Sequence, residues 1–138
     1  MDSTKQYTNH NNSIEPITEI RMTQKRGKGV FASKNIMQNT IIESCQLIIF
    51  SEDEAEIIEK TVLSNYWYSW KEHEKKEYGA LCLGNGCLYN HSSHPNAMVI
   101  KDYDSKLIHF IAITDIPKGG EITVKYGTVW FNEEEENN

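Results

Sequence analysis

The sequence predicts a mostly β fold of the β-rich α+β class. Many short runs either alternate apolar and polar residues or concentrate β-branched residues, and both patterns are typical of strands. Clusters of Gly, Asn, Asp and Pro separate these runs and predict turns. Only one segment carries the start signals of a helix. Hydrophobic periodicity therefore gives the fold class but not the arrangement of the strands.

Strands are expected at intervals along the chain. Ile17–Met22 alternates apolar and polar residues, and Val30–Ala32 resumes an extended run after a turn that contains two glycines. Thr40–Phe50 is rich in β-branched residues and predicts one or two strands. The remaining expected strands are Tyr66–Trp70, the pair Met98–Tyr103 and Leu107–Ile113, and the short Glu121–Lys125.

The one expected helix begins after Ser51. Ser51-Glu52-Asp53-Glu54 has the pattern of a capping box, in which the serine and the glutamate each bond to the other's backbone. Ala55, Ile58 and Val62 would form one apolar stripe, so the helix is expected to run to about Leu63.

Two polar stretches are expected to lie outside regular structure. Residues 84–96 hold two glycines, three asparagines and a proline, and predict mostly loop. The charged stretch Lys71–Glu77 is expected to be exposed.

Length and composition indicate one globular domain. The 138 residues are 38% hydrophobic and 25% charged, as in soluble domains. We expect a polar N-terminal arm at residues 1–15, the domain at 16–131 and an acidic tail at 132–138. No apolar stretch is long enough to span a bilayer, and Met1–Asn12 has no apolar core of a secretory signal.

Cysteine count and net charge limit the setting and the partners. Three cysteines, an odd number, argue against a disulfide framework and for a reducing, intracellular setting. The net charge of -6 argues against non-specific binding of nucleic acid, which needs many cationic side chains. An acidic surface suits a basic protein partner.

Three segments combine residue types that could carry chemistry. Gly27–Ala32 (GKGVFA) holds a Gly-x-Gly turn, through which a backbone can approach a ligand closely. Leu88–Ala97 (LYNHSSHPNA) presents Asn90 and His91, although such residues also simply hold loops in place. Gly120–Gly127 (GEITVKYG) ends in Tyr126, which by itself is most simply a packed edge-strand tyrosine. Each segment alone has a purely structural interpretation.

Taken together and in this order, the three segments resemble the SET domain of protein lysine methyltransferases. The family signatures are a Gly-x-Gly turn followed by Phe-Ala, an Asn-His-Ser-x-x-Pro-Asn segment, and a Gly-Glu-Glu-Leu/Ile-Thr segment leading to Tyr-Gly. The resemblance extends from about Ile17 to Phe131, and the Ala80–Gly86 segment is similar to small viral and bacterial members. It implies several short sheets, a C-terminal pseudoknot and one main helix.

The resemblance implies S-adenosylmethionine as cofactor and a protein lysine as methyl acceptor. Backbone groups of Lys28, Gly29 and Val30 would hold the amino-acid end of the cofactor. The side chains of Asn90 and His91 would hold its amine and adenine. Tyr126 would contact the cofactor and orient the incoming amine, as the catalytic residue.

A further set of aromatic residues is expected to line the lysine channel: Tyr66, Tyr68, Trp130 and Phe131. Such a channel would lower the pKa of the substrate lysine by excluding water, and the cofactor's sulfonium would lower it further. The neutral amine needed for methyl transfer would then form without a strong base.

The chain also departs from many members of the family. It lacks the cysteine-rich pre-SET segment and the Cys-x-Cys cluster after Tyr126, so the zinc-bound modules around the domain are missing. Val124 stands where some members have the Phe or Tyr that limits the number of methyl groups added. The resemblance therefore does not predict mono-, di- or trimethylation.

Two other functions are open to the same residues. Cys82, Cys87, His91 and His94 could form a small zinc-binding module, although structural zinc sites usually separate their ligand pairs by about a dozen residues. A catalytically inactive SET-fold module could instead bind lysine or methyl-lysine, with aromatic residues of Tyr66–Trp70 as a cage. Our expectation is that Trp67 packs in the core, and that the chain is an active enzyme which uses no metal.

The sequence does not identify the substrate protein. A histone tail is the first candidate by resemblance to small SET proteins, and a non-histone protein is nearly as good. A histone substrate would place the enzyme in the nucleus or on chromatin. Neither direct nucleic-acid binding nor a membrane is expected, and a homodimer is left open.

Overall fold

A computed structural model of the chain describes residues 15–71 and 78–125. The strands are β1 (Thr18–Met22), β2 (Lys28–Ala32), β3 (Ile41–Phe50), β4 (Tyr68–Trp70), β5 (Tyr78–Cys82), β6 (Asn90–His91), β7 (Ala97–Asp102), β8 (Leu107–Ala112) and β9 (Glu121–Val124). The helix α2 spans Glu52–Ile58, and a 3₁₀ helix follows at Val62–Asn65. The expected mostly β fold with one helix is confirmed.

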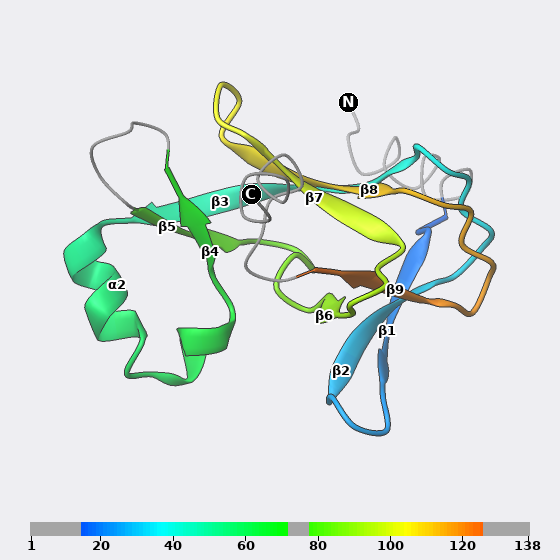
Figure 1. Cartoon of the computed structure of the whole chain (residues 1–138), viewed down its shortest axis with the longest axis horizontal. Helices are drawn as coiled ribbons and strands as arrows, with labels where there is room; N and C mark the ends of the chain where they lie inside the picture. The colour runs from blue at the N-terminus through cyan, green and yellow to red at the C-terminus, as the bar shows by residue number, and fades with distance from the viewer. Residues whose placement is uncertain (1–14, 72–77, 126–138) are drawn as a thin grey trace, which may run out of the picture.

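The strands form two sheets. One has the order β1-β2-β9-β6, and the other the order β4-β5-β3-β8-β7. Figure 1 shows α2 beside β4 and β5 at one end of the molecule, and the β1-β2 hairpin at the other. One core joins the two sheets, and its largest fully buried side chains include Trp70, Tyr89 and Phe110.

Sheet pairing in the first sheet brings the three sequence segments together. β2 carries the Gly-x-Gly turn, and β9 pairs with it antiparallel through Val30 and Phe31. On its other side β9 pairs with β6 in parallel, with Asn90 opposite Thr123 and His91 opposite Val124. The approach of these segments agrees with the expected pseudoknot. The expected threading of the C-terminal segment concerns residues after Lys125, which lie outside the described residues.

The expected helix is shorter than the sequence pattern indicates. The capping box at Ser51 and Glu54 is present, but α2 ends at Ile58 and not near Leu63. The Thr61 hydroxyl donates to the Ile58 carbonyl at 2.7 Å, and Thr61 then caps the 3₁₀ helix. A side chain that bonds to nearby backbone in this way competes with the helix. Val62 consequently leaves the apolar stripe and is 82% exposed.

Two strands and one packing expectation also differ from the sequence pattern. β5 is not predicted by it, and β6 lies within the stretch expected to be mostly loop. Trp67 packs edge-on against Phe50, with ring centroids 5.5 Å apart, but it is only half-buried. No helix in the described part of the chain is long and apolar enough to cross a membrane.

Candidate active site

The tip of the β1-β2 hairpin is a tight, internally bonded turn. Thr23 closes it, because its amide and its hydroxyl both donate to the Gly27 carbonyl, at 2.6 and 2.8 Å. Gly27 has a φ of +72°, a conformation that glycine adopts without strain. The turn therefore holds Lys28 and Gly29 in a fixed position at the start of β2.

Gly29 lies directly against the Asn90 segment. A Cβ added to Gly29 would stand 2.6 Å from Glu121 Oε2 and 2.9 Å from Asn90 Nδ2, both too close for a real contact. The second glycine of the Gly-x-Gly turn thus permits a close approach, as the sequence indicates, since any Cβ there would displace the Glu121 and Asn90 side chains.

Asn90 is the buried polar side chain at the centre of this region. It is 9% exposed, and its Nδ2 donates to the Lys28 carbonyl at 3.1 Å and to Glu121 Oε2 at 2.8 Å. One side chain therefore bonds to both β2 and β9. The Arg26 guanidinium also donates to the His91 carbonyl, so the hairpin tip is attached to β6 at a second point.

The backbone of β2 is free of the β9 ladder where the cofactor is expected. β9 pairs with β2 only at Val30 and Phe31, so Lys28 and Gly29 extend beyond it. Val30 has a fully buried side chain, and only its main chain could reach a ligand. On this side of β2, Lys28 and Gly29 therefore lie outside the ladder, although the Lys28 carbonyl accepts from Asn90, whereas Val30 is paired with Ile122.

Asn96 holds β9 in place beside this site. Its Nδ2 donates to the Glu121 carbonyl at 2.8 Å, and its Oδ1 accepts from the Thr123 amide at 2.8 Å. The amide side chain thereby bonds to β9 as a neighbouring strand would. The roles of Asn96 and Glu121 were not predicted, although both residues belong to the quoted motifs.

The residues before Asn90 are anchored on the second sheet. Glu43 of β3 accepts from the Tyr89 hydroxyl at 2.7 Å and from the Asn85 amide at 2.9 Å. The Tyr89 ring stacks on Phe110, with centroids 4.2 Å apart. Burial, reinforced by the Glu43 charge, raises the pKa of the Tyr89 hydroxyl well above its usual range. Tyr89 therefore stays protonated and keeps donating to Glu43.

Among the residues expected in the lysine channel, only two are described. Tyr66 follows the 3₁₀ helix and is 39% exposed. Tyr68 in β4 is half-buried, and its hydroxyl donates to the Gly86 carbonyl at 3.0 Å. Both lie at the end of the molecule that carries the five-stranded sheet, to which β4 belongs. Tyr126, Trp130 and Phe131 lie outside the described residues.

The cysteines and histidines of the alternative zinc module are not arranged as a metal site. In the described part of the chain, which includes all four residues, no three His, Cys, Asp or Glu side chains could share a metal ion. Burial raises the pKa of the Cys87 thiol. A metal ligand needs the thiolate, which these surroundings disfavour.

Comparison with known proteins agrees with this geometry. The SET domain family matches residues 27–127. A histone-lysine N-methyltransferase of Schizosaccharomyces pombe, specific for H3 lysine-37, is 36% identical over 118 residues, which is 84% of this chain and 78% of that protein.

Solved structures show the same fold. A candidate histone methyltransferase of Plasmodium falciparum is 30% identical, with a TM-score of 0.61 over 86% of this chain and 99% of that chain. CpSET8 from Cryptosporidium is 24% identical, with a TM-score of 0.65, over 94% of this chain and 67% of that one. The SET domain protein DIM-5 of Neurospora, a histone lysine methyltransferase, is 21% identical, with a TM-score of 0.64, over 80% and 52%.

The chain therefore belongs to the SET domain family, and it is a protein-lysine N-methyltransferase. Enzymes of this family generally use S-adenosylmethionine.

Proposed function

We propose that the chain transfers a methyl group from S-adenosylmethionine to a histone lysine, with the cofactor bound against the surface that the hairpin tip and the Asn90 segment form together. The observation that carries this proposal is the close approach of Gly29 to the Asn90 amide and the Glu121 carboxylate, both of which a Cβ at position 29 would displace. The backbone of Lys28 and Gly29 and the polar side chains of Asn90 and Glu121 lie at the same place, where Asn90 bonds to both Lys28 and Glu121.

The charge of the site fits a cationic cofactor. S-adenosylmethionine carries a sulfonium and an ammonium group, and when bound it supplies an activated methyl group. The Glu121 carboxylate lies beside Asn90 and Gly29, and a nearby negative charge favours a cation. Asn90, His91 and the backbone of Lys28, Gly29 and Val30 would hold the cofactor.

Tyr126 would act on the acceptor amine. It follows the end of β9, the strand that lies between β2 and β6, by two residues. Its hydroxyl would orient the lysine amine toward the methyl group. Positioning of this kind accounts for up to about 7–11 kcal/mol of a reaction barrier. The aromatic residues Tyr66, Tyr68, Trp130 and Phe131 would exclude water from the channel.

A histone substrate is supported by two observations. The relative from Schizosaccharomyces pombe is described as specific for H3 lysine-37, and the net charge of -6 suits a basic tail. Such a substrate would place the enzyme in the nucleus. An H3 peptide around that lysine is the first to assay, followed by whole core histones.

Tyr126→Phe tests the catalytic part of the proposal. The substitution keeps the ring and removes one hydroxyl, so cofactor affinity and melting temperature should change little. Turnover of labelled cofactor on histones should fall by about 10²–10³, the usual loss for one preorganised polar group. Tyr7→Phe, in the N-terminal arm, is the matched control. A Tyr126→Phe enzyme with unchanged turnover would contradict the catalytic assignment.

The cofactor site is tested separately by ligand-induced stabilisation. Cofactor at 100 times its dissociation constant should add about 2.7 kcal/mol to the free energy of unfolding. Asn90→Ala should reduce this stabilisation more than it reduces the stability of the free protein. If neither the cofactor nor its demethylated product shifts the melting temperature at saturation, the proposed site is wrong.

A further inference from the structure

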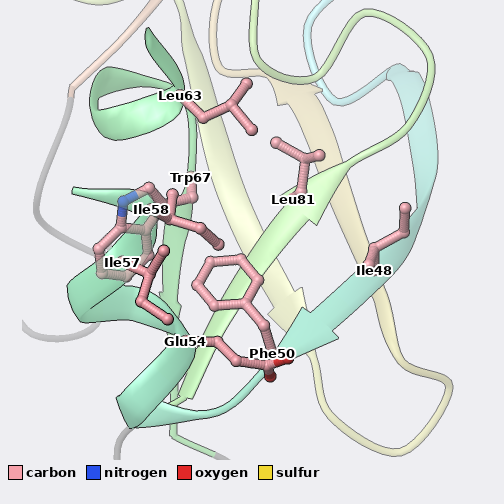
Figure 2. Close-up of a pocket in the computed structure, with 8 residues that line it drawn as sticks. All are labelled: Ile48, Phe50, Glu54, Ile57, Ile58, Leu63, Trp67 and Leu81. Atoms are coloured by element: carbon pink, nitrogen blue, oxygen red, sulfur yellow. The ribbon is translucent and has the colours of Figure 1, made fainter. Parts of the chain in front are cut away.

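The end of the molecule away from the cofactor motifs carries an open apolar pocket. We call it the α2 pocket; it has a volume of about 380 Å³. Its lining residues come from α2, the 3₁₀ helix and strands β3 and β5, together with one residue before β4: Ile48, Phe50, Glu54, Ile57, Ile58, Leu63, Trp67 and Leu81. Figure 2 shows Ile57 and Ile58 of α2 on one side and Phe50 and Leu81 of the sheet on the other.

Among the described residues, this pocket gathers large apolar side chains that stay exposed. Ile57 is 65% exposed, Ile48 52% and Leu63 39%, and no residue of α2 is buried. A soluble domain rarely leaves several large apolar side chains together in water, and such patches mark binding sites. The volume lies at the small end of ligand pockets, about 300–1,000 Å³. It therefore suits one or two bulky apolar side chains.

The helix that forms one side of the α2 pocket is strongly acidic. Five of the eight residues from 52 to 59 are acidic: Glu52, Asp53, Glu54, Glu56 and Glu59. Glu59 Oε2 accepts from the indole N–H of Trp67 at 2.7 Å, so one carboxylate lies at the pocket wall itself. The seven residues of α2 extend about 10 Å at 1.5 Å per residue, which is about one Debye length at 0.1 M salt. The five charges therefore act together on anything that binds there.

The apolar lining and the acidic helix beside it together define the partner. We propose that the α2 pocket docks a basic segment of the protein substrate, remote from the target lysine, that inserts one bulky apolar side chain flanked by Lys or Arg. A second copy of this chain fits less well, because it would bring a net charge of -6 against the acidic helix. As a statement about the substrate the proposal rests on the proposed function, but docking is measurable without cofactor or methyl transfer.

The direct test is fluorescence anisotropy with labelled peptides and no cofactor. The first peptide alternates Lys and Arg around one central Phe; the second has Ala in place of the Phe; the third has Glu in place of every Lys and Arg. The first should bind at least about tenfold more tightly than the second, the effect of burying one large apolar side chain. Binding of the first peptide should weaken as salt rises from 0.05 to 0.5 M. The third peptide should not bind.

Two variants with matched controls locate the docking. Ile57→Ser should lower the affinity for the first peptide about tenfold. Met37→Ser, at a 73% exposed position outside the pocket, should leave this affinity unchanged. Glu56→Lys should also lower the affinity, whereas Asp104→Lys in the β7-β8 turn should not. Equal affinity for the Phe and Ala peptides would overturn the proposal, as would equal effects of Ile57→Ser and Met37→Ser. A concentration-dependent dimer that Ile57→Ser abolishes would assign the pocket to a second copy instead.

Catalysis separates this proposal from the proposed function. With core histones as substrate, Ile57→Ser should raise KM and leave kcat unchanged. If the wild-type chain binds the peptide but transfers no methyl group, only the proposed function fails. If Ile57→Ser methylates histones with an unchanged kcat/KM, only the docking proposal fails.

Discussion

The two sheets of this enzyme are held together in different ways. In the five-stranded sheet β8 pairs with β7 along its whole length, and β3 pairs with both β8 and β5. In the four-stranded sheet β9 meets β2 only at Val30 and Phe31, and β6 only at Asn90 and His91. Long ladders and buried rings support the five-stranded sheet. In the four-stranded sheet β1 and β2 form a long ladder, but single polar side chains complete the attachment of β9.

This difference indicates which substitutions should disturb the active site most. Asn90 joins β6 to β2 and β9, and Asn96 joins the start of β7 to β9. Because the short ladders supply few backbone bonds, removal of one amide should disturb the cofactor site more than a comparable change in the five-stranded sheet. Substitutions in each of the two sheets can test this difference.

Asn96→Ala should have the largest effect. It leaves the Glu121 carbonyl and the Thr123 amide without their side-chain partner, and each unsatisfied buried group costs about 1–3 kcal/mol. The free energy of unfolding in urea should fall by about 2–5 kcal/mol, and the folded fraction should bind cofactor more weakly. Asn65→Ala, at an exposed position, is the control. Unchanged stability in Asn96→Ala would remove the contrast between the sheets.

Lys101→Met should have a smaller effect of opposite sign, on the five-stranded side. Lys101 Nζ donates to Ser69 Oγ at 3.0 Å. Burial, with the nearby Lys71 charge, lowers the pKa of Lys101 from 10.5 to about 8. The folded state therefore disfavours the charged form, and this penalty is complete below pH 8 and absent above about 10.5. Each unit of pKa corresponds to about 1.4 kcal/mol; the hydrogen bond lost in the variant reduces the gain.

The expected gain for Lys101→Met is thus about 1–2 kcal/mol at pH 7, from urea unfolding, with cofactor affinity unchanged. The difference from wild type should narrow steadily between pH 8 and 10.5. A difference that stays constant across this range would mean that the charge of Lys101 is not what costs stability.

Local patterns predicted the parts of the fold that depend on neighbouring residues. The β7-β8 hairpin, β1 and the capping box at Ser51 are all visible in short stretches of sequence. β5 was missed because Gly79 interrupts it, and glycine usually weakens a strand. The Phe50 ring occupies the space instead, since a Cβ on Gly79 would stand 2.2 Å from Phe50 Cε1. That requirement comes from a residue 29 positions away in sequence and cannot be read locally.

The candidate site divides in the same way. Gly29 and Asn90 were predicted from motifs, and the structure brings them together. The bonds of Asn96 to β9 and of Glu121 to Asn90 depend on segments 25 and 31 residues apart. No pattern within either segment indicates them. The prediction that Val62 belongs to the apolar stripe of the helix was wrong for the opposite reason. Apolar spacing alone would have continued the helix, but the Thr61 hydroxyl bonds to the Ile58 carbonyl where the helix ends.

Ser51→Ala should have the smallest effect, confined to α2. The Ser51 hydroxyl accepts from the Glu54 amide at 3.2 Å, and the Ser51 amide donates to Glu54 Oε1 at 2.9 Å. Loss of an N-cap typically costs about 0.5–2 kcal/mol. Because α2 buries no residue and lies at the far end from the hairpin tip (Figure 1), cofactor affinity should not change. Peptide binding at the α2 pocket should weaken, because Ile57 and Ile58 belong to the same helix.

The pH dependence identifies the capping box as the cause. Hydrogen bonds from the Ser51 amide and hydroxyl lower the pKa of Glu54 below its usual value of 4.5. A depressed carboxyl pKa contributes stability that is present above about pH 4.5 and is lost as pH falls through the folded-state value. The stability difference between wild type and Ser51→Ala should therefore be largest at neutral pH and shrink in acid. If Ser51→Ala instead lowers cofactor affinity, α2 and the cofactor site are coupled, and the two ends of the molecule do not act independently.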